Sequence, residues 1–65
     1  MTLEELEARV KKLSLRATDA KMNLHDLSEE LPADWQKIPE VAEATWQIFK
    51  DLDEARKALK AAKQA

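Results

Sequence analysis

The 65-residue chain contains no cysteine and no glycine, and it has only two prolines. Without cysteine it has no thiolate nucleophile, no disulfide framework and no ligand set for a zinc finger or an iron–sulfur cluster. Without glycine it has no glycine-rich phosphate loop. No segment approaches the roughly 18 consecutive apolar residues of a membrane span. These absences exclude several classes of enzyme, metalloprotein and membrane protein.

Charge is abundant but balanced. Charged residues make up 37% of the chain, with 11 basic and 13 acidic residues and a net charge of −2. The basic residues form no dominant stripe, so nucleic acid is not an expected partner. The first ten residues, MTLEELEARV, lack the basic and apolar regions of a secretory signal. We therefore predict a small cytoplasmic helical domain with no membrane partner.

Residues 2–31 carry the pattern of one long amphipathic helix. Thr2 and Glu5 have the spacing of a capping box, which marks a helix start. Pro32 has no amide donor and restricts the residue before it, so the helix is predicted to end near residue 31. Apolar residues recur between these limits at spacings of three and four, as in a coiled-coil seam: Leu3, Leu6, Val10, Leu13, Ala17, Ala20, Leu24, Leu27 and Leu31.

Residues 32–39, PADWQKIP, are predicted to be a linker. Asp34 is expected to cap a short turn, and Pro39 suits the first position of a second helix over 39–63. This second helix repeats the seam with Val41, Thr45, Ile48, Leu52, Ala55, Leu59 and Ala62. A linker this short lets the helices fold back on each other. Residues 1–65 are therefore predicted to form a single all-α domain, an antiparallel two-helix hairpin.

One hairpin offers little apolar surface to offset the conformational entropy of ordering its chain. The leucines at 13, 24, 27, 52 and 59 and Ile48 are expected to be buried in the seam. Further apolar residues lie outside it, where they suit an interface with other copies: Ala8, Leu15, Ala42, Trp46 and Phe49. We therefore predict a homo-oligomeric helical bundle, either a dimer or a tetramer.

The stretch KMNLHDLSEE contains the only histidine and places acidic residues where the first helix ends. Acidic side chains are unfavourable there because the helix dipole is negative at its C-terminal end. Met22, His25, Asp26 and Glu29 share one helical face. Three interpretations remain open: a solvated face; a docking face for a partner protein that also includes Glu30 and Trp35; and a divalent-metal site of His25, Asp26 and Glu29. No other cofactor is expected.

No pattern indicates an active site. The seam carries Leu and Ala with only Thr45 polar, and neither serine has a base on a matching face. The opening LEELEARVKKL is similar to the first helix of the helical chorismate mutases. The chain has no third helix, however, and no inward Arg/Lys cluster for a dicarboxylate. We therefore predict a protein that is not an enzyme.

The stretch KMNLHDLSEELPADWQKIPEVAEAT resembles a family of very short helical proteins encoded among nitrogen-fixation genes, next to NifX. Its most specific part is LHDLSEELP, followed by the WQKIP linker and the Ala42–Phe49 segment, and the similarity spans nearly the whole chain. The resemblance implies an accessory role in nitrogenase biogenesis, with another nitrogen-fixation protein as partner. It assigns no reaction and no catalytic residue. It places the docking interpretation ahead of the metal site.

Overall fold

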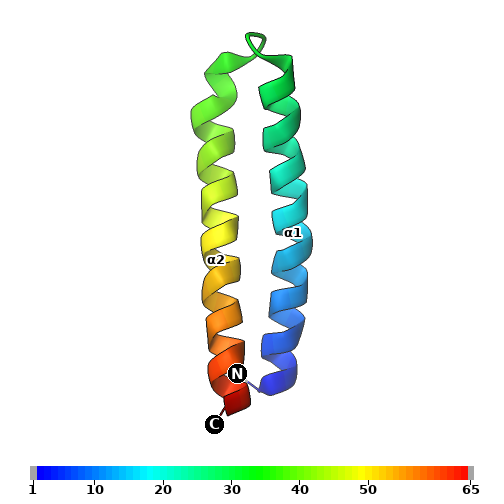
Figure 1. Cartoon of the computed structure of the whole chain (residues 1–65), viewed down its shortest axis with the longest axis vertical. Helices are drawn as coiled ribbons and strands as arrows, with labels where there is room; N and C mark the ends of the chain where they lie inside the picture. Colours follow the sequence, from blue (N-terminus) through cyan, green and yellow to red (C-terminus); the bar gives the residue numbers. More distant parts are fainter. Residues whose placement is uncertain (1, 65) are drawn as a thin grey trace.

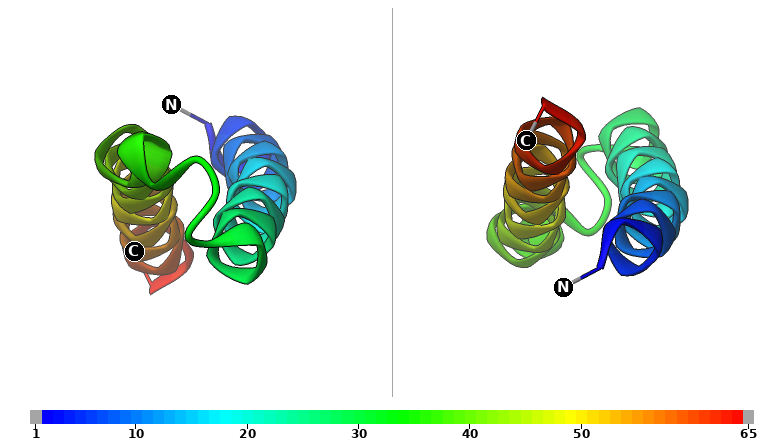
Figure 2. Two further views of the ribbon diagram at one scale, coloured as in Figure 1. Left: turned by 90° about the horizontal axis from the view of Figure 1, so that it is seen from above. Right: turned by 90° about the horizontal axis from the view of Figure 1, so that it is seen from below.

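The protein is described by a computed structural model covering residues 2–64. It contains two long helices, α1 (Leu3–Glu30) and α2 (Ile38–Gln64), with a short 3-10 helix, η1 (Trp35–Lys37), between them. The helices run antiparallel and side by side, and the connection closes one end of the pair (Figure 1). Seen along its length, the described chain is a single pair of helices (Figure 2). The predicted all-α hairpin is confirmed, and it is a rod with Cα extents of 49 × 15 × 14 Å.

The first helix begins at a side-chain cap, as the Thr2–Glu5 spacing predicts. The Glu5 amide donates to Thr2 Oγ1 at 3.1 Å, and the Thr2 hydroxyl donates to Glu5 Oε1 at the same distance. The Leu6 amide donates to the Thr2 carbonyl, which closes the first turn. The bond to Thr2 Oγ1 satisfies the Glu5 amide, which has no carbonyl partner within the helix.

The connection differs in detail from the predicted linker. Helix α1 ends at Glu30, because Leu31 is extended (φ −55°, ψ 141°), as the residue before a proline prefers. The Leu31–Pro32 peptide bond is cis. Helix α2 begins at Ile38, so Pro39 is its second residue, in a turn whose amides need no helical acceptor. The helices therefore span 3–30 and 38–64, where we predicted 2–31 and 39–63.

The prediction that the Asp34 side chain caps the turn is wrong. Asp34 takes the left-handed conformation (φ 58°, ψ 26°), and its side chain makes no capping hydrogen bond. Its backbone carbonyl instead accepts from the Lys37 amide at 2.9 Å. Its carboxylate lies 3.9 Å from Lys37 Nζ, in an exposed ion pair. Aspartate suits the turn here because it tolerates this backbone conformation better than most residues.

The core lies in the middle of the rod, between the two helices. Leu13, Ala17, Leu52 and Ala55 form one buried cluster, with Val10 and Ile48 packed against it. Ala17 is the most buried of them, at 3% exposed, so a small side chain lies at the most enclosed position. A small residue at this position lets the two backbones approach closely.

Thr45, the polar residue of the seam, is accommodated without an unsatisfied hydroxyl. Its Oγ1 donates to the Val41 carbonyl at 2.8 Å, within α2. It also lies 3.5 Å from the Ala20 carbonyl on α1, which shows that Ala20 and Thr45 face each other across the seam.

The seam is less buried than predicted. Leu13, Leu27 and Leu52 are buried, but Leu24, Ile48 and Leu59 are only partly buried. The reason is geometric, since each residue in a two-helix pair has one neighbouring helix and remains open to solvent on both flanks. The hairpin therefore shelters its apolar residues incompletely.

Candidate docking face at the turn end

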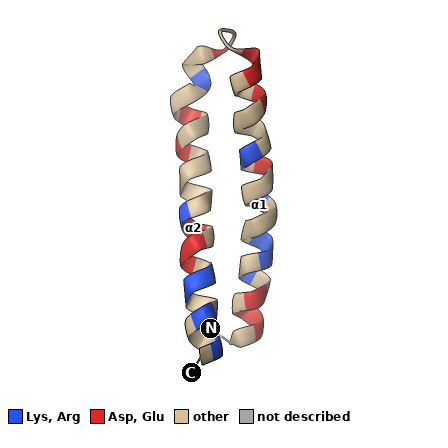
Figure 3. Cartoon of the chain, in the orientation of Figure 1, with Lys and Arg blue, Asp and Glu red and all other residues tan. Residues whose placement is uncertain are grey.

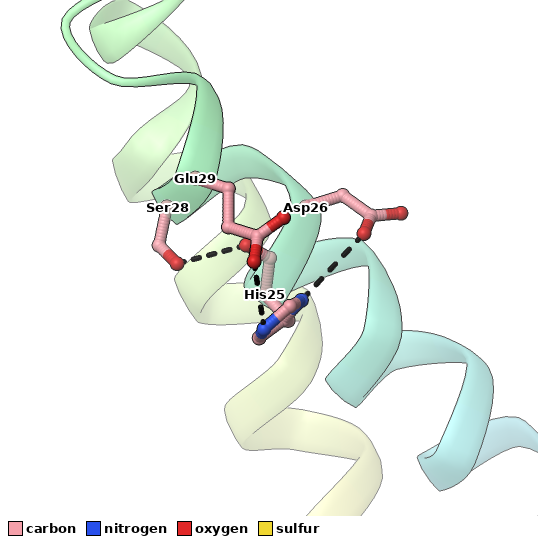
Figure 4. A network of polar contacts seen from close by, with 4 residues as sticks. All are labelled: His25, Asp26, Ser28 and Glu29. Carbon is pink, nitrogen blue, oxygen red and sulfur yellow. Dashed lines mark hydrogen bonds and ion pairs between the residues drawn. The ribbon is translucent and has the colours of Figure 1, made fainter.

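The last two turns of α1 bring a histidine and two carboxylates together (Figure 4). His25 Nε2 lies 3.3 Å from Glu29 Oε1, and Nδ1 lies 3.7 Å from Asp26 Oδ1. The i,i+4 spacing of a helix brings His25 and Glu29 within reach of each other. All three side chains are exposed. The imidazole ring is thus held between two carboxylates on the surface of the rod.

Ser28 supports this arrangement through the backbone. Its hydroxyl donates to the His25 carbonyl at 2.8 Å. This side-chain donor bonds to the α1 backbone about one turn before the helix ends at Glu30.

Among residues 2–64, His25, Asp26 and Glu29 form a group with the spacing of metal ligands. One ligand atom from each lies within 4.8 Å of the others. Imidazole nitrogen and carboxylate oxygen both suit divalent ions. Three ligands from one helix supply roughly half of a six-ligand shell, so water or another protein would complete it.

The turn end of the rod is strongly acidic. Residues 22–43 contain six acidic residues and a single lysine, a net charge of −5 with histidine neutral. Since the whole chain carries −2, the remaining residues carry +3. The last turn of α1 has no basic residue, whereas the last turn of α2 has Lys63. Acidic positions lie on both helices near the turn, and basic positions gather at the open end of α2 (Figure 3).

Two large apolar side chains, Met22 and Trp35, are exposed at the same end of the rod as His25, Asp26 and Glu29. Met22 begins the face that continues through His25, Asp26 and Glu29, and it is 58% exposed. Trp35 begins η1 on the other side of the turn and is 60% exposed. All six residues of the predicted docking face are therefore exposed at one end of the rod, and four of them share one face of α1.

The residues predicted for an interface between copies also lie on the surface. Leu15 is 64% and Trp46 59% exposed, and Ala8 and Phe49 are exposed too, while Ala42 is partly buried. Lys50 Nζ lies 5.1 Å from the centre of the Trp46 ring, a cation–π contact within α2. Within residues 2–64, no helix is both long and apolar enough to cross a membrane.

Sequence reasoning missed a shallow hollow of about 360 Å³ at the open end of the rod. It is lined by Arg56, Leu59, Lys60, Lys63 and Gln64. The three cations recur at i, i+4 and i+7, a spacing that the sequence contains and that would have indicated a basic face. The neighbouring Lys57 does not line the hollow and instead forms an ion pair within α2. Its Nζ lies 2.9 Å from Asp53 Oδ2, and this hydrogen-bonded carboxylate raises the pKa of Lys57.

Comparison with known proteins places this hairpin in a family. A family model described as Rop-like matches residues 1–64. The chain belongs to the Rop-like family. A UPF0437 protein of Azorhizobium caulinodans is 59% identical to this Rop-like chain over 58 residues, covering 89% of this chain and 84% of the relative. A UPF0437 protein of Nostoc is 42% identical over 59 residues, covering 91% and 83%.

Two further relatives bear on genome context and fold. A protein of Frankia alni, 37% identical over 46 residues, is named a UPF0437 protein in the nifX–nifW intergenic region; the match covers 71% of this chain and 56% of that protein. An NMR structure, Northeast Structural Genomics Consortium target McR1, is 46% identical with a TM-score of 0.91, covering 100% of this chain and 92% of the other. The resemblance to a small helical family near nitrogen-fixation genes is confirmed.

Proposed function

We propose that this Rop-like protein is a non-enzymatic, oligomeric accessory protein that docks another protein of nitrogen fixation. The observation that carries the proposal is the exposed His25, Asp26 and Glu29 cluster, flanked by Met22, on an end of the rod with net charge −5. Exposed apolar side chains beside charged groups are typical of a protein interface. The net charge favours a basic surface on the partner.

The acidic residues at the end of α1 lower the stability of the helix, and this supports a role for them in recognition. Asp26, Glu29 and Glu30 lie at the negative end of the α1 dipole, with no basic residue in the last turn to offset them. Each costs a few tenths of a kcal/mol at such a position. Natural proteins commonly keep such locally unfavourable residues at functional sites. The nitrogen-fixation assignment of the partner rests on the printed name of the Frankia alni relative.

The absence of buried polar side chains among the described residues supports the non-enzymatic part of the proposal. Enzymes hold their acids, bases and charge-stabilising groups in sites that exclude water. Here the titratable side chains of residues 2–64 are exposed, apart from the partly buried Asp51.

Two observations support self-association. Several seam residues are only partly buried, and large apolar side chains are exposed outside the seam at Leu15, Trp46 and Phe49. The Rop-like family, to which the chain belongs, consists of dimeric helical hairpins. Replacing Trp46 by glutamate should lower the molar mass in sedimentation equilibrium before circular dichroism detects any loss of helix. An unchanged molar mass for Trp46→Glu and Leu15→Glu would contradict this part of the proposal.

Affinity purification from nitrogen-fixing cells tests the docking face. The triple change His25→Ala, Asp26→Asn and Glu29→Gln should reduce recovery of the partner, and the reduction should be greater at low salt than at high salt. The matched control Glu7→Gln, Asp19→Asn removes the same two charges from other turns of α1 and should recover the partner as the wild type does. Equal recovery by both variants would refute the docking face.

A second candidate function is binding of a divalent ion by His25, Asp26 and Glu29, favoured by the 4.8 Å grouping of their ligand atoms. Calorimetric titration with Fe²⁺, Ni²⁺ or Zn²⁺ should then show a saturable site that His25→Ala abolishes. The site should weaken in acidic solution, because a proton competes with the ion for the imidazole nitrogen. Titrations without heat of binding would exclude this candidate and leave the docking face as it stands.

A further inference from the structure

The outer surface of α1 carries a stripe of apolar residues that the hairpin leaves exposed. Ala8, Leu15 and Met22 recur every seven residues, and Glu29 continues the series. Leu15 is 64% and Met22 58% exposed, and Ala8 is exposed too. We call Ala8, Leu15 and Met22 the outer stripe. It runs along α1 into the docking face, which begins at Met22.

The outer stripe points away from α2. Each of its residues lies two positions after one seam residue and two positions before the next. For Leu15 these neighbours are Leu13 and Ala17, which are 6% and 3% exposed. Since an α-helix turns by about 100° per residue, two positions correspond to about 200°, nearly the opposite side of the helix. A second copy that covers an open flank of the seam would therefore leave the outer stripe in solvent.

The spacing of the outer stripe indicates what kind of segment can cover it. The backbone amides and carbonyls inside a helix are already paired, so α1 cannot bind a partner by adding a strand. Residues seven apart form a line along the helix axis, and such a line fits a second helix that runs along it at a small crossing angle. Leu15 and Met22 would be the two large contacts, about 10 Å apart along the axis.

Around Ala8 the charges beside the outer stripe cancel. Glu4 and Glu5 lie one turn before Ala8, and Lys11 and Lys12 lie one turn after it. This end of the stripe therefore favours neither sign of charge in a partner.

Around Met22 the charges beside the outer stripe are acidic. Asp19 lies three residues before Met22 and Asp26 four residues after it, so both adjoin it on the helix surface. Glu29 follows at the next position of the heptad series. Lys21 is next to Met22 in the sequence but lies about 100° round the helix, toward a flank of the seam. A covering segment is therefore favoured when it carries lysine or arginine at the end that lies beside Met22.

We propose that the outer stripe binds an amphipathic helix of the docking partner. Two large apolar residues of that helix, seven positions apart, would pack against Leu15 and Met22, and its basic end would lie beside Asp26. The proposal rests on the docking function proposed above and adds the chemistry of the segment that binds. It extends the docking face along α1 to Leu15, and it leaves self-association to the exposed apolar residues of α2.

Two labelled peptides of the same composition test the surface directly. Both are helix-forming peptides of about 18 residues with lysines at one end. In the first peptide two leucines lie seven positions apart, and in the second one leucine is moved by two positions, to the opposite side of the helix. Fluorescence anisotropy should show that the protein binds the first peptide about tenfold more tightly than the second, because only the first can bury both leucines.

A pair of matched variants locates the binding surface. Leu15→Gln should weaken binding of the first peptide by about tenfold. Leu3→Gln makes the same chemical change at an exposed position of α1 outside the outer stripe and should leave binding nearly unchanged. A first peptide that does not bind, equal binding of the two peptides, or equal effects of the two variants would each overturn the proposal.

The affinity purification described above separates this proposal from the docking function on which it rests. Leu15→Gln should reduce recovery of the partner, as the triple change at His25, Asp26 and Glu29 does, while Leu3→Gln should not. If only the triple change reduced recovery, the docking face would stand and the helix on the outer stripe would be wrong. If neither reduced recovery, both proposals would be wrong.

Sedimentation equilibrium tests the other occupant of the outer stripe, a second copy of this chain. Leu15→Gln should keep the molar mass of the wild type, because the outer stripe lies opposite the seam. A lower molar mass for Leu15→Gln than for Leu3→Gln would show that another copy covers the outer stripe, and it would overturn the proposal.

Discussion

The middle of the hairpin and its turn end differ in what they bury. In the middle, Leu13, Ala17, Leu52 and Ala55 pack into one cluster and are 3–6% exposed. At the turn end, every residue from 28 to 40 is exposed, and the polar contacts lie on the surface. Folding free energy comes mainly from apolar burial, so the middle of the rod supplies most of it. The turn end can therefore change its side chains for recognition at little cost to the fold.

The largest effect should come from the middle. Leu52→Ala should lower the free energy of unfolding by roughly 2–5 kcal/mol, because it removes buried methyl groups and leaves a cavity. The same change at the turn end, Leu31→Ala, should cost less than about 1 kcal/mol, since Leu31 is exposed. Urea denaturation measures both. Equal losses would remove the distinction between the two regions.

Ala17 offers a second comparison with the turn. Ala17→Leu should cost roughly 1–3 kcal/mol, because a larger side chain must be fitted into a position that is only 3% exposed. Ala33→Leu adds the same atoms at an exposed position of the turn and should leave the melting temperature nearly unchanged. A harmless Ala17→Leu would show that the helices do not meet closely at Ala17.

The turn has one conformational requirement of its own, at Asp34. Its left-handed backbone suits glycine and disfavours β-branched residues. Asp34→Gly should therefore be more stable than Asp34→Val by roughly 1–2 kcal/mol in thermal or urea unfolding. Equal stability of the two variants would mean that the turn readily adopts another backbone conformation.

The smallest effect on stability should come from the docking face itself. The triple change His25→Ala, Asp26→Asn, Glu29→Gln should alter the free energy of unfolding by a few tenths of a kcal/mol, in the stabilising direction. The sign follows because two negative charges leave the negative end of α1. Urea denaturation of variant and wild type, at one protein concentration, measures the difference. A loss above about 1 kcal/mol would assign the cluster a structural role.

Sequence reasoning succeeded where local rules decide the outcome. The seam spacing, Thr2 and Pro32 predict both helices, because helix periodicity and the missing proline amide act within a few residues. The contact of His25 with Glu29 follows from the same periodicity. Leu59 was expected to be buried and is only partly so, since burial depends on how many helices surround a residue.

Two other features depend on the folded structure and could not be predicted from local sequence patterns. An aspartate in a turn can either cap with its side chain or enter the left-handed region, and local sequence does not decide between them; in the structure Asp34 takes the second. The hollow beside Leu59 is formed by side chains that the sequence lists without their directions. The partner that a docking face would select depends on the surface of another molecule as much as on His25 and its neighbours.

The separation of acidic and basic charge along the hairpin also has a kinetic consequence. A rod with −5 at one end and +3 over the remainder is a permanent electric dipole, and the field of a basic surface exerts a torque on it. A single hairpin would rotate during its approach and arrive turn end first, with an association rate that falls as salt is added.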